Sequence, residues 1–266
     1  MDKWEKFEIA WTEFLKKTYG DVAYFERMGG SDSTKPDILV RRKNGTQFFI
    51  ETKMCPAQCG QFVLLPDKAT RTFKYSERNE NPINEFAETI MRFMDRHFDS
   101  FVNAGTSGIT LEFNNMEDVF CNWIMKIYRE KDVEIFATND FMALPLSDFP
   151  KFFNVTAKYR IKRSGSSPVG NTRVAEIVNY IKNNYAVFDI KANEEGAVFC
   201  KSTKNLHNLR FEHNGIEYMF SYREGIFEVR RLSNTFNANV IFSITLKHPT
   251  PKAMSKDEFE KHLKGN

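Results

Sequence analysis

Long apolar runs are absent from this 266-residue chain, and cysteines are few. No segment approaches the roughly 20 apolar residues that a membrane-spanning helix needs, so no membrane partner is expected. The first residues, MDKWEKFE, contain no apolar signal-peptide core, which predicts a cytoplasmic protein. Only two of the four cysteines, Cys55 and Cys59, are close in sequence, so a four-ligand zinc site is not supported and reduced thiols are expected.

A large excess of charge of one sign is also absent. The formal net charge of +3 is too small for a protein that coats DNA generally. Positive charge is instead concentrated between residues 157 and 173, where no acidic residue occurs. Cations, hydroxyls and free amides bind phosphate oxygens, so DNA contact is predicted here, although a solvated linker between domains would have similar composition. The candidate DNA-binding residues of this segment are Lys158, Arg160, Lys162, Arg163, Ser164 and Ser166.

A β-hairpin is predicted between residues 37 and 53, where two strands flank a glycine-containing turn. With a three-residue turn, Lys43 to Gly45, Asp37 lies directly across from Glu51, whereas a two-residue turn would place Asp37 across from Thr52. A shift of one residue reverses the face of every side chain, so the apolar pattern selects the register. The three-residue turn is favoured because it alone leaves a wholly apolar face, formed by Ile38, Val40, Phe48 and Ile50.

The charged end of this hairpin has the residue types that phosphodiester hydrolysis needs. Mg²⁺ prefers oxygen ligands and is usually held by one or two carboxylates, a role that fits Asp37 and Glu51. Lys53 emerges on the same strand face as Glu51 and could orient or deprotonate a water, or counter charge at phosphorus. The alternative is a charged edge hairpin in which Lys53 is a surface lysine at a strand end.

The pattern Pro36-Asp37 followed by Glu51-Thr52-Lys53, with a Gly-Gly-Ser loop before it and an amphipathic helix over residues 3–18, resembles the PD-(D/E)XK nuclease superfamily. The resemblance is to the branch of archaeal Holliday-junction resolvases, Mrr-like proteins and type II restriction endonucleases. It covers residues 5–65 specifically and extends loosely to about residue 150. It implies Mg²⁺ as cofactor.

The resemblance also implies roles for individual residues. Asp37, Glu51 and Glu8 are expected as catalytic metal ligands, with Glu13 as the alternative helix carboxylate, and Lys53 as the catalytic lysine. Three further residues are expected to contact DNA: Ser31, Gln58 and Gln61. The alternative for Glu8 and Glu13 is a solvated helix carboxylate, and the alternative for Gln58 and Gln61 is a polar loop.

Helices are expected at 81–103 and 116–130, and strands at 108–113 and 133–138, an alternation typical of an α/β domain with a mixed sheet flanked by helices. With the resemblance to the PD-(D/E)XK superfamily, this alternation implies that residues 1–165 form a restriction-endonuclease-like core. After a helix at 172–184, short strand-like runs and an Asn214-Gly215 turn predict a smaller β-rich domain over 171–266, interpreted as a DNA-specificity element.

These features together predict a Mg²⁺-dependent type II restriction endonuclease that cuts double-stranded DNA at a specific sequence. A structure-selective nuclease and a non-catalytic DNA-binding module on the same fold are the alternatives. The resemblance further implies a homodimer and a cognate methyltransferase that acts on the same site.

Overall fold

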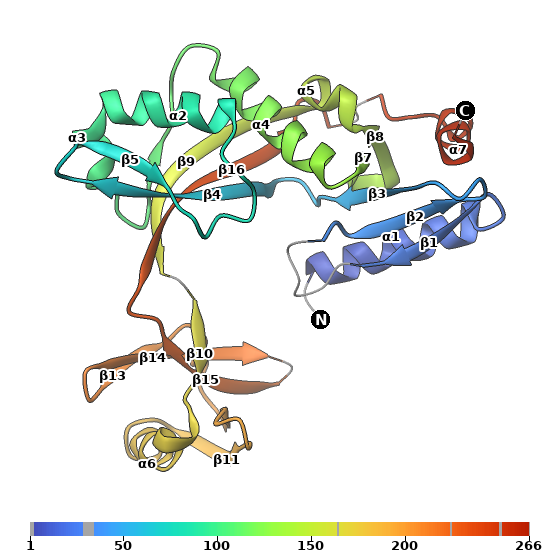
Figure 1. Cartoon of the computed structure of the whole chain (residues 1–266). Helices are drawn as coiled ribbons and strands as arrows, with labels where there is room; N and C mark the ends of the chain where they lie inside the picture. Colours follow the sequence, from blue (N-terminus) through green and yellow to red (C-terminus); the bar gives the residue numbers. More distant parts are fainter. Residues whose placement is uncertain (1–2, 29–34, 164, 224, 250–251, 266) are drawn as a thin grey trace. The chain divides into compact units, whose positions relative to one another are not determined.

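The computed structural model describes residues 3–28, 35–163, 165–223, 225–249 and 252–265. The chain forms two compact units, the first made of residues 1–161 and 238–266 and the second of residues 162–237 (Figure 1). Within the described residues, no helix is both long and apolar enough to cross a membrane.

The first unit contains a mixed five-stranded sheet with helices on both faces. β3 (Gln47–Thr52) and β7 (Val133–Thr138) run parallel, and the other neighbouring strands of this sheet are antiparallel. Helix α1 (Lys3–Tyr19) covers one face together with α7 (Lys256–Lys264), and α4 (Met116–Glu130) covers the other. This confirms the expected α/β core. In sheet order the strands are β1 (Ala23–Arg27), β2 (Ile38–Arg42), β3 (Gln47–Thr52), β7 (Val133–Thr138) and β8 (Met142–Pro145).

The hairpin of β2 and β3 has the register that its apolar pattern favours. Ile38 pairs with Ile50, and the Arg42 N–H donates to the Thr46 carbonyl at 2.8 Å, which leaves a three-residue turn. Gly45 closes this turn at φ +88°, a conformation that costs glycine little. The apolar face is fully buried in the core that contains α1, and the same register places positions 37 and 51 opposite each other on the other face.

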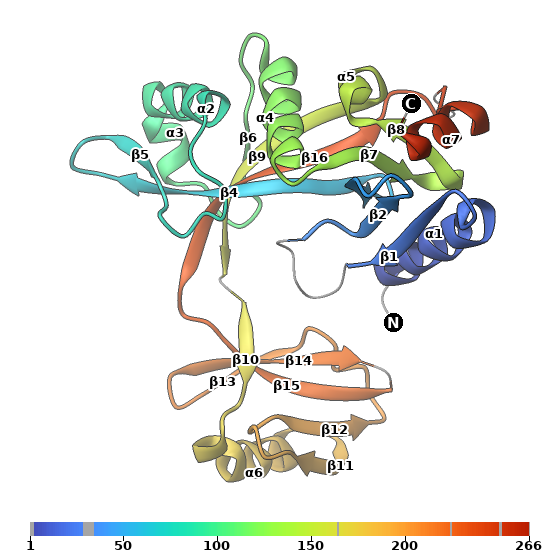
Figure 2. The ribbon, with the colours of Figure 1, turned by 45° about the vertical axis from the view of Figure 1, so that its right-hand side comes forward.

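A second five-stranded sheet in the first unit has the order β5-β4-β16-β9-β6. Apolar residues on one of its faces pack against α2 (Glu85–Arg96), α3 (Phe98–Val102) and α4 (Figure 2). The expected helix 81–103 is thus divided at His97, and the expected strand 108–113 is reduced to two residues. The strands are β5 (Thr72–Tyr75), β4 (Ala57–Asp67), β16 (Phe236–Leu246), β9 (Phe153–Arg163) and β6 (Ile109–Thr110).

The division of the chain differs from the expected boundaries of 1–165 and 171–266. Residues 238–266 return to the first unit, where β16 lies between β4 and β9 and α7 packs near β2. The second unit is therefore an insertion between two neighbouring strands, not a C-terminal domain. The apolar run of β16 predicts a strand correctly but contains no information about which sheet the strand joins.

The second unit is β-rich, as expected. Its sheet has the order β11-β12-β15-β14-β13, with β10 (Ser166–Pro168) paired to β15. Helix α6 (Val174–Asn184) buries Ile177 and Ile181 in the core of this unit. The Asn214-Gly215 turn joins β13 to β14, as expected. Both residues have positive φ, which a tight two-residue hairpin turn requires. The remaining strands are β11 (Val187–Ala192), β12 (Val198–Ser202), β13 (Arg210–His213), β14 (Ile216–Arg223) and β15 (Ile226–Leu232).

Candidate active site

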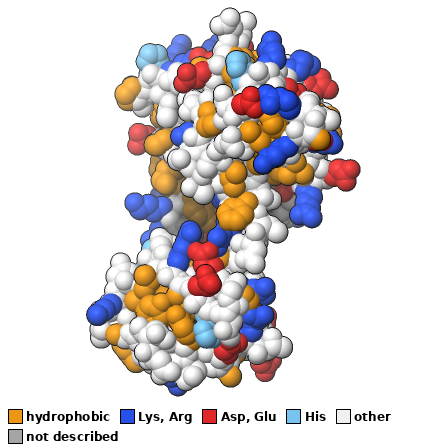
Figure 3. Space-filling view, turned by 90° about the vertical axis from the view of Figure 1, so that its left-hand side faces the viewer, with side chains coloured by type: hydrophobic (Ala, Val, Ile, Leu, Met, Phe, Trp, Pro, Cys, Tyr) orange, Lys and Arg blue, Asp and Glu red, His pale blue; other side chains and the backbone are white. Residues whose placement is uncertain are grey.

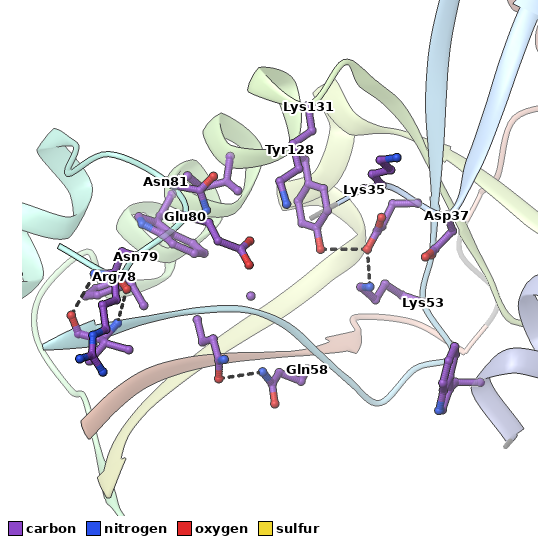
Figure 4. Close-up of a pocket in the computed structure, with 18 of the residues that line it drawn as sticks. Lys35, Asp37, Lys53, Gln58, Arg78, Asn79, Glu80, Asn81, Tyr128 and Lys131 are labelled. Atoms are coloured by element: carbon purple, nitrogen blue, oxygen red, sulfur yellow. Dashed lines mark hydrogen bonds and ion pairs between the residues drawn. The ribbon is translucent and has the colours of Figure 1, made fainter. Parts of the chain in front are cut away.

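A pocket of about 470 Å³ lies in the first unit at the charged end of the hairpin. Its lining includes Asp37 just before β2, Glu51 at the end of β3, Lys53 just after it, and Tyr128 of α4 (Figure 4). The three residues that the sequence pattern singled out thus converge on one cavity. Tyr128 joins them from the helix that covers this face of the sheet.

Asp37 is held by the neighbouring strand. Its Oδ2 atom accepts hydrogen bonds from the backbone N–H and the Oγ1 hydroxyl of Thr52, both at 2.7 Å. Its Oδ1 atom has no hydrogen-bond donor among the described residues. The strand therefore fixes the carboxylate while one oxygen stays available to a ligand.

Glu51 is buried, with 6% of its surface exposed. The Lys53 ammonium donates to Glu51 Oε1 at 2.5 Å, and the Tyr128 hydroxyl donates to the same oxygen at 3.1 Å. Burial raises the pKa of the Glu51 carboxyl, the Lys53 charge opposes this shift, and the Asp37 charge adds to it. Burial also raises the pKa of the Tyr128 phenol far above its usual value, so the hydroxyl keeps its proton and donates.

Lys53 is a stable cation in this arrangement. Burial by itself lowers the pKa of its ammonium, but the carboxylates of Glu51 and Asp37 outweigh burial and raise the pKa above its usual value. A group that holds its proton this firmly is suited to stabilise negative charge and poorly suited to accept a proton from water. Of the roles considered for Lys53, its close pairing with the Glu51 carboxylate fits charge stabilisation.

The helix carboxylate in this pocket is Glu8, not Glu13. Glu8 is 6% exposed and lines the pocket, whereas Glu13 is exposed and is absent from the lining. Arg27 donates to Glu8 Oε2 from Nε at 3.2 Å and from Nη2 at 2.9 Å. Burial, followed by the Asp37 charge, raises the pKa of Glu8. The described residues contain no cluster of three or more potential metal ligands, so a metal role for Glu8 stays a prediction.

Asp37 and Glu51 have the chemistry of a divalent-cation site. Each has one oxygen without a donor in the described part of the chain, Oδ1 of Asp37 and Oε2 of Glu51. The Asp37 charge raises the pKa of Glu51, which shows that the two carboxylates repel each other. A cation shared by both would relieve this repulsion, and two carboxylates with added waters suit Mg²⁺.

The second sheet extends this site with a polar surface. A shallow pocket of about 310 Å³ is lined by residues of three adjacent strands, β4, β16 and β9. Gln58 lines both this pocket and the larger one, and its amide donates to Gln61 at 3.3 Å. Gln58 therefore lies between the pocket that contains the carboxylates and the part of the second sheet that contains Lys158 and Arg160. The other residues of the shallow pocket are Thr156, Lys158, Arg160, Ile241 and Ser243.

The rest of the predicted basic segment belongs to the second unit. Lys162 is exposed, but Arg163 forms an ion pair with Glu217 at 2.6 Å and lies over the ring of Phe236. Ser166 accepts hydrogen bonds from Arg230 through its hydroxyl at 3.2 Å and its carbonyl at 2.8 Å. The segment is thus divided between two units, and Arg163 and Ser166 have structural partners there. Ser31 and Ser164 lie outside the described residues.

Several residues of the pocket lining were not predicted from the sequence, among them Tyr128 and a polar segment before α2. Tyr128 is on the buried stripe of α4, where a pattern of apolar residues gives it no distinguishing signal. The polar segment from Arg78 to Asn81 also lines the pocket, and Asn79 anchors it by bonding the backbone N–H and carbonyl of Val63 at 2.7 and 3.0 Å. This run of charged and amide residues between a strand and a helix is the sequence feature that could have indicated a polar pocket wall.

Comparison with known proteins identifies the fold. No protein-family model and no curated protein matches the chain. Among solved structures, HhaI endonuclease in complex with DNA matches with a TM-score of 0.82 and 36% sequence identity. The match covers 98% of this chain and 99% of that one, so it includes both units. The chain therefore belongs to the HhaI endonuclease family and has a restriction-endonuclease-like fold.

Proposed function

We propose that this protein is a Mg²⁺-dependent type II restriction endonuclease that hydrolyses phosphodiester bonds of double-stranded DNA at a specific sequence. The observation that carries the proposal is the convergence of Asp37, Glu51 and Lys53 in one pocket of a chain that belongs to the HhaI endonuclease family. The HhaI enzyme was solved with DNA, which supports DNA as the substrate.

The residues of the pocket divide the chemistry between them. Asp37 and Glu51 are the residues that would hold the metal, since each has one oxygen without a hydrogen-bond donor in the described residues. When bound, Mg²⁺ polarises a phosphate oxygen and lowers the pKa of a bound water. Lys53, fixed as an ammonium, stabilises the negative charge that develops on the phosphate oxygens.

DNA would extend from this pocket over the polar face of the second sheet. Gln58 and Gln61 provide amides beside the carboxylates, and Lys158 and Arg160 provide phosphate-binding cations on β9. On the molecular face in Figure 3, Lys and Arg side chains are interspersed with Asp and Glu on both units. This mixture supports a localised contact instead of a uniformly basic surface.

The second unit, residues 162–237, is the candidate for the sequence-specificity element. It is an insertion between β9 and β16, so its removal is compatible with an intact first unit. The expected homodimer and the cognate methyltransferase are part of the same proposal. Sedimentation of the protein with and without cognate DNA tests whether it forms the homodimer.

Digestion of a mapped plasmid, with Mg²⁺ or with EDTA, tests the proposed function. We expect discrete fragments in Mg²⁺ only, and sequencing of their ends should return one short sequence. Cleavage confined to branched substrates would indicate the structure-selective alternative. DNA binding without cleavage in any divalent metal would indicate a non-catalytic module.

A further inference from the structure

Tyr128 contacts the candidate metal ligand Glu51 from a different element of the fold. Its side chain projects from α4 and is largely buried, and its hydroxyl lies 3.1 Å from Glu51 Oε1. Its ring packs edge-on against Phe136, with the ring centroids 5.0 Å apart. Phe136 is the β7 residue that pairs with Glu51 in the parallel register, so α4 and both strands jointly fix the phenol.

Two donors thus converge on a single oxygen of Glu51. The Lys53 ammonium comes from the residue just after β3, two positions beyond Glu51, and the Tyr128 hydroxyl comes from α4 (Figure 4). Oε2 has no donor among the described residues. A carboxylate with one oxygen bonded twice has little rotational freedom, so the free oxygen keeps one direction in the pocket.

We propose that Tyr128 is a positioning residue for metal-dependent DNA cleavage, which fixes the Glu51 carboxylate so that its Oε2 atom would be available to a metal in the pocket. The inference rests on the proposed function, because it assigns Glu51 as a metal ligand. It goes beyond the three-residue motif, since the role assigned to Tyr128 is to hold Glu51 through their hydrogen bond, not to ligate the metal itself. A packing role alone would require the ring but not the hydroxyl.

The variant Tyr128→Phe separates these two roles, because it keeps the ring and removes the hydroxyl. Binding of Mn²⁺ to the protein, followed by electron paramagnetic resonance, gives a readout that does not depend on cleavage. Loss of a residue that orients a metal ligand typically weakens binding by roughly 10- to 100-fold, which is the expected increase in the Mn²⁺ dissociation constant. The Mg²⁺ concentration for half-maximal cleavage should rise in parallel.

Tyr159→Phe is the matched control. Tyr159 is a buried tyrosine of the same unit whose hydroxyl bonds the Leu64 carbonyl at 3.4 Å, and it is absent from the lining of the pocket. This variant loses a buried hydroxyl without any contact to a carboxylate, so Mn²⁺ affinity should stay at the wild-type value. Thermal unfolding of both variants reports whether the fold is retained.

A second comparison tests whether Tyr128 acts through Glu51. In a Glu51→Gln background, Tyr128→Phe should cause no further loss of Mn²⁺ affinity, because the residue it positions is already altered. An additional loss in that background would overturn the proposed route.

Wild-type Mn²⁺ affinity in Tyr128→Phe would overturn the inference and leave the proposed function intact. Failure of the wild-type protein both to bind Mn²⁺ and to cut DNA would instead overturn the proposed function, and the inference with it.

Discussion

The Lys53 ammonium lies 2.5 Å from Glu51 Oε1, and the two side chains are only 18% and 8% exposed. An ion pair this buried does not by itself show that the pair stabilises the fold, because both charges lose their hydration when they are buried. Removal of one partner is costly, however, since it leaves the other charge buried alone. The pair therefore links the chemistry of the site to the stability of the first unit.

Substitution of Lys53 by Met should destabilise the fold in a pH-dependent manner. At about pH 8 the loss in unfolding free energy should be on the order of 3 kcal/mol, because Glu51 is left as an unpaired buried carboxylate. Burial raises the pKa of Glu51, so the folded protein takes up this proton at a higher pH than the unfolded chain does. The difference in unfolding free energy between wild type and variant should therefore shrink as pH falls through the pKa of Glu51 in the folded protein. It should be smallest below the ordinary pKa of a glutamate side chain. Urea unfolding of wild type and variant across this range measures it.

The double variant Lys53→Met with Glu51→Gln is the internal control for this prediction. Neutralising the orphaned carboxylate should recover most of the lost stability at neutral pH. Equal deficits at high and low pH, or no recovery in the double variant, would show that the ion pair is not the source.

Lys53→Ala should lower the cleavage rate by roughly 10²-fold or more, because the charge that stabilises the phosphate oxygens is lost. Binding of DNA in Ca²⁺, which should allow binding without rapid cleavage, should persist. Lys43→Ala, in the exposed hairpin turn, controls for loss of a positive charge from the same hairpin. Single-turnover kinetics that match wild type would return Lys53 to a structural role.

The basic segment should not behave as one DNA contact. The double variant Lys158→Ala with Arg160→Ala should reduce the slope of log K against log salt by about 0.9 per lost phosphate contact, on all sequences alike. Arg163→Ala should mainly destabilise the second unit, since Arg163 is paired with Glu217. Anisotropy titrations in Ca²⁺ at several salt concentrations measure the slope, with Lys16→Ala on α1 as the charge control.

An unchanged salt slope in the Lys158 and Arg160 variant would remove the polar sheet face from the DNA interface. If one of these residues instead reads a guanine edge, its single variant should lose roughly 1–3 kcal/mol on the cognate site and far less on random DNA.

Replacement of residues 162–237 by a short Gly-Ser linker should leave a folded first unit, because the insertion joins two neighbouring strands. If the second unit reads sequence, this variant should cut with relaxed specificity or not at all. A truncation near Ser167 is a poor substitute, since it removes β16 from the middle of the second sheet. Full sequence specificity in the replacement variant would assign recognition to the first unit.

The sequence predicted the hairpin site well, for identifiable physical reasons. A glycine suited to positive φ and an apolar face that tolerates only one register together determined that Asp37 opposes Glu51. Ser255 and Glu258 likewise form a capping box at the start of α7, a motif of residues only three positions apart. In both cases the decisive interactions are local in sequence.

Contacts between segments that are distant in the sequence were predicted less well. The strand β16 was predicted, but its pairing with β4, which is distant in the sequence, could not be read from an apolar run. Tyr128 reaches Glu51 from a distant helix, and a tyrosine on a buried helical stripe is indistinguishable from a core residue. Gln58 and Gln61 were expected to contact DNA, with a polar loop as the alternative interpretation. They lie on β4, whose pairing with β16 shifts register next to Gly60 at φ +114°, and this irregularity has no clear sign in the sequence.

The most direct test of the proposed metal site is cleavage of a mapped plasmid in Mg²⁺ by Asp37→Ala and Glu51→Ala, with DNA binding measured in parallel. Glu13→Ala, an exposed carboxylate on α1 outside the pocket lining, is the control. We expect both pocket variants to lose cleavage while DNA binding survives or tightens, because repulsion between carboxylate and phosphate falls. Near-native cleavage by either purified variant would contradict the assignment of Asp37 and Glu51 as the catalytic metal ligands.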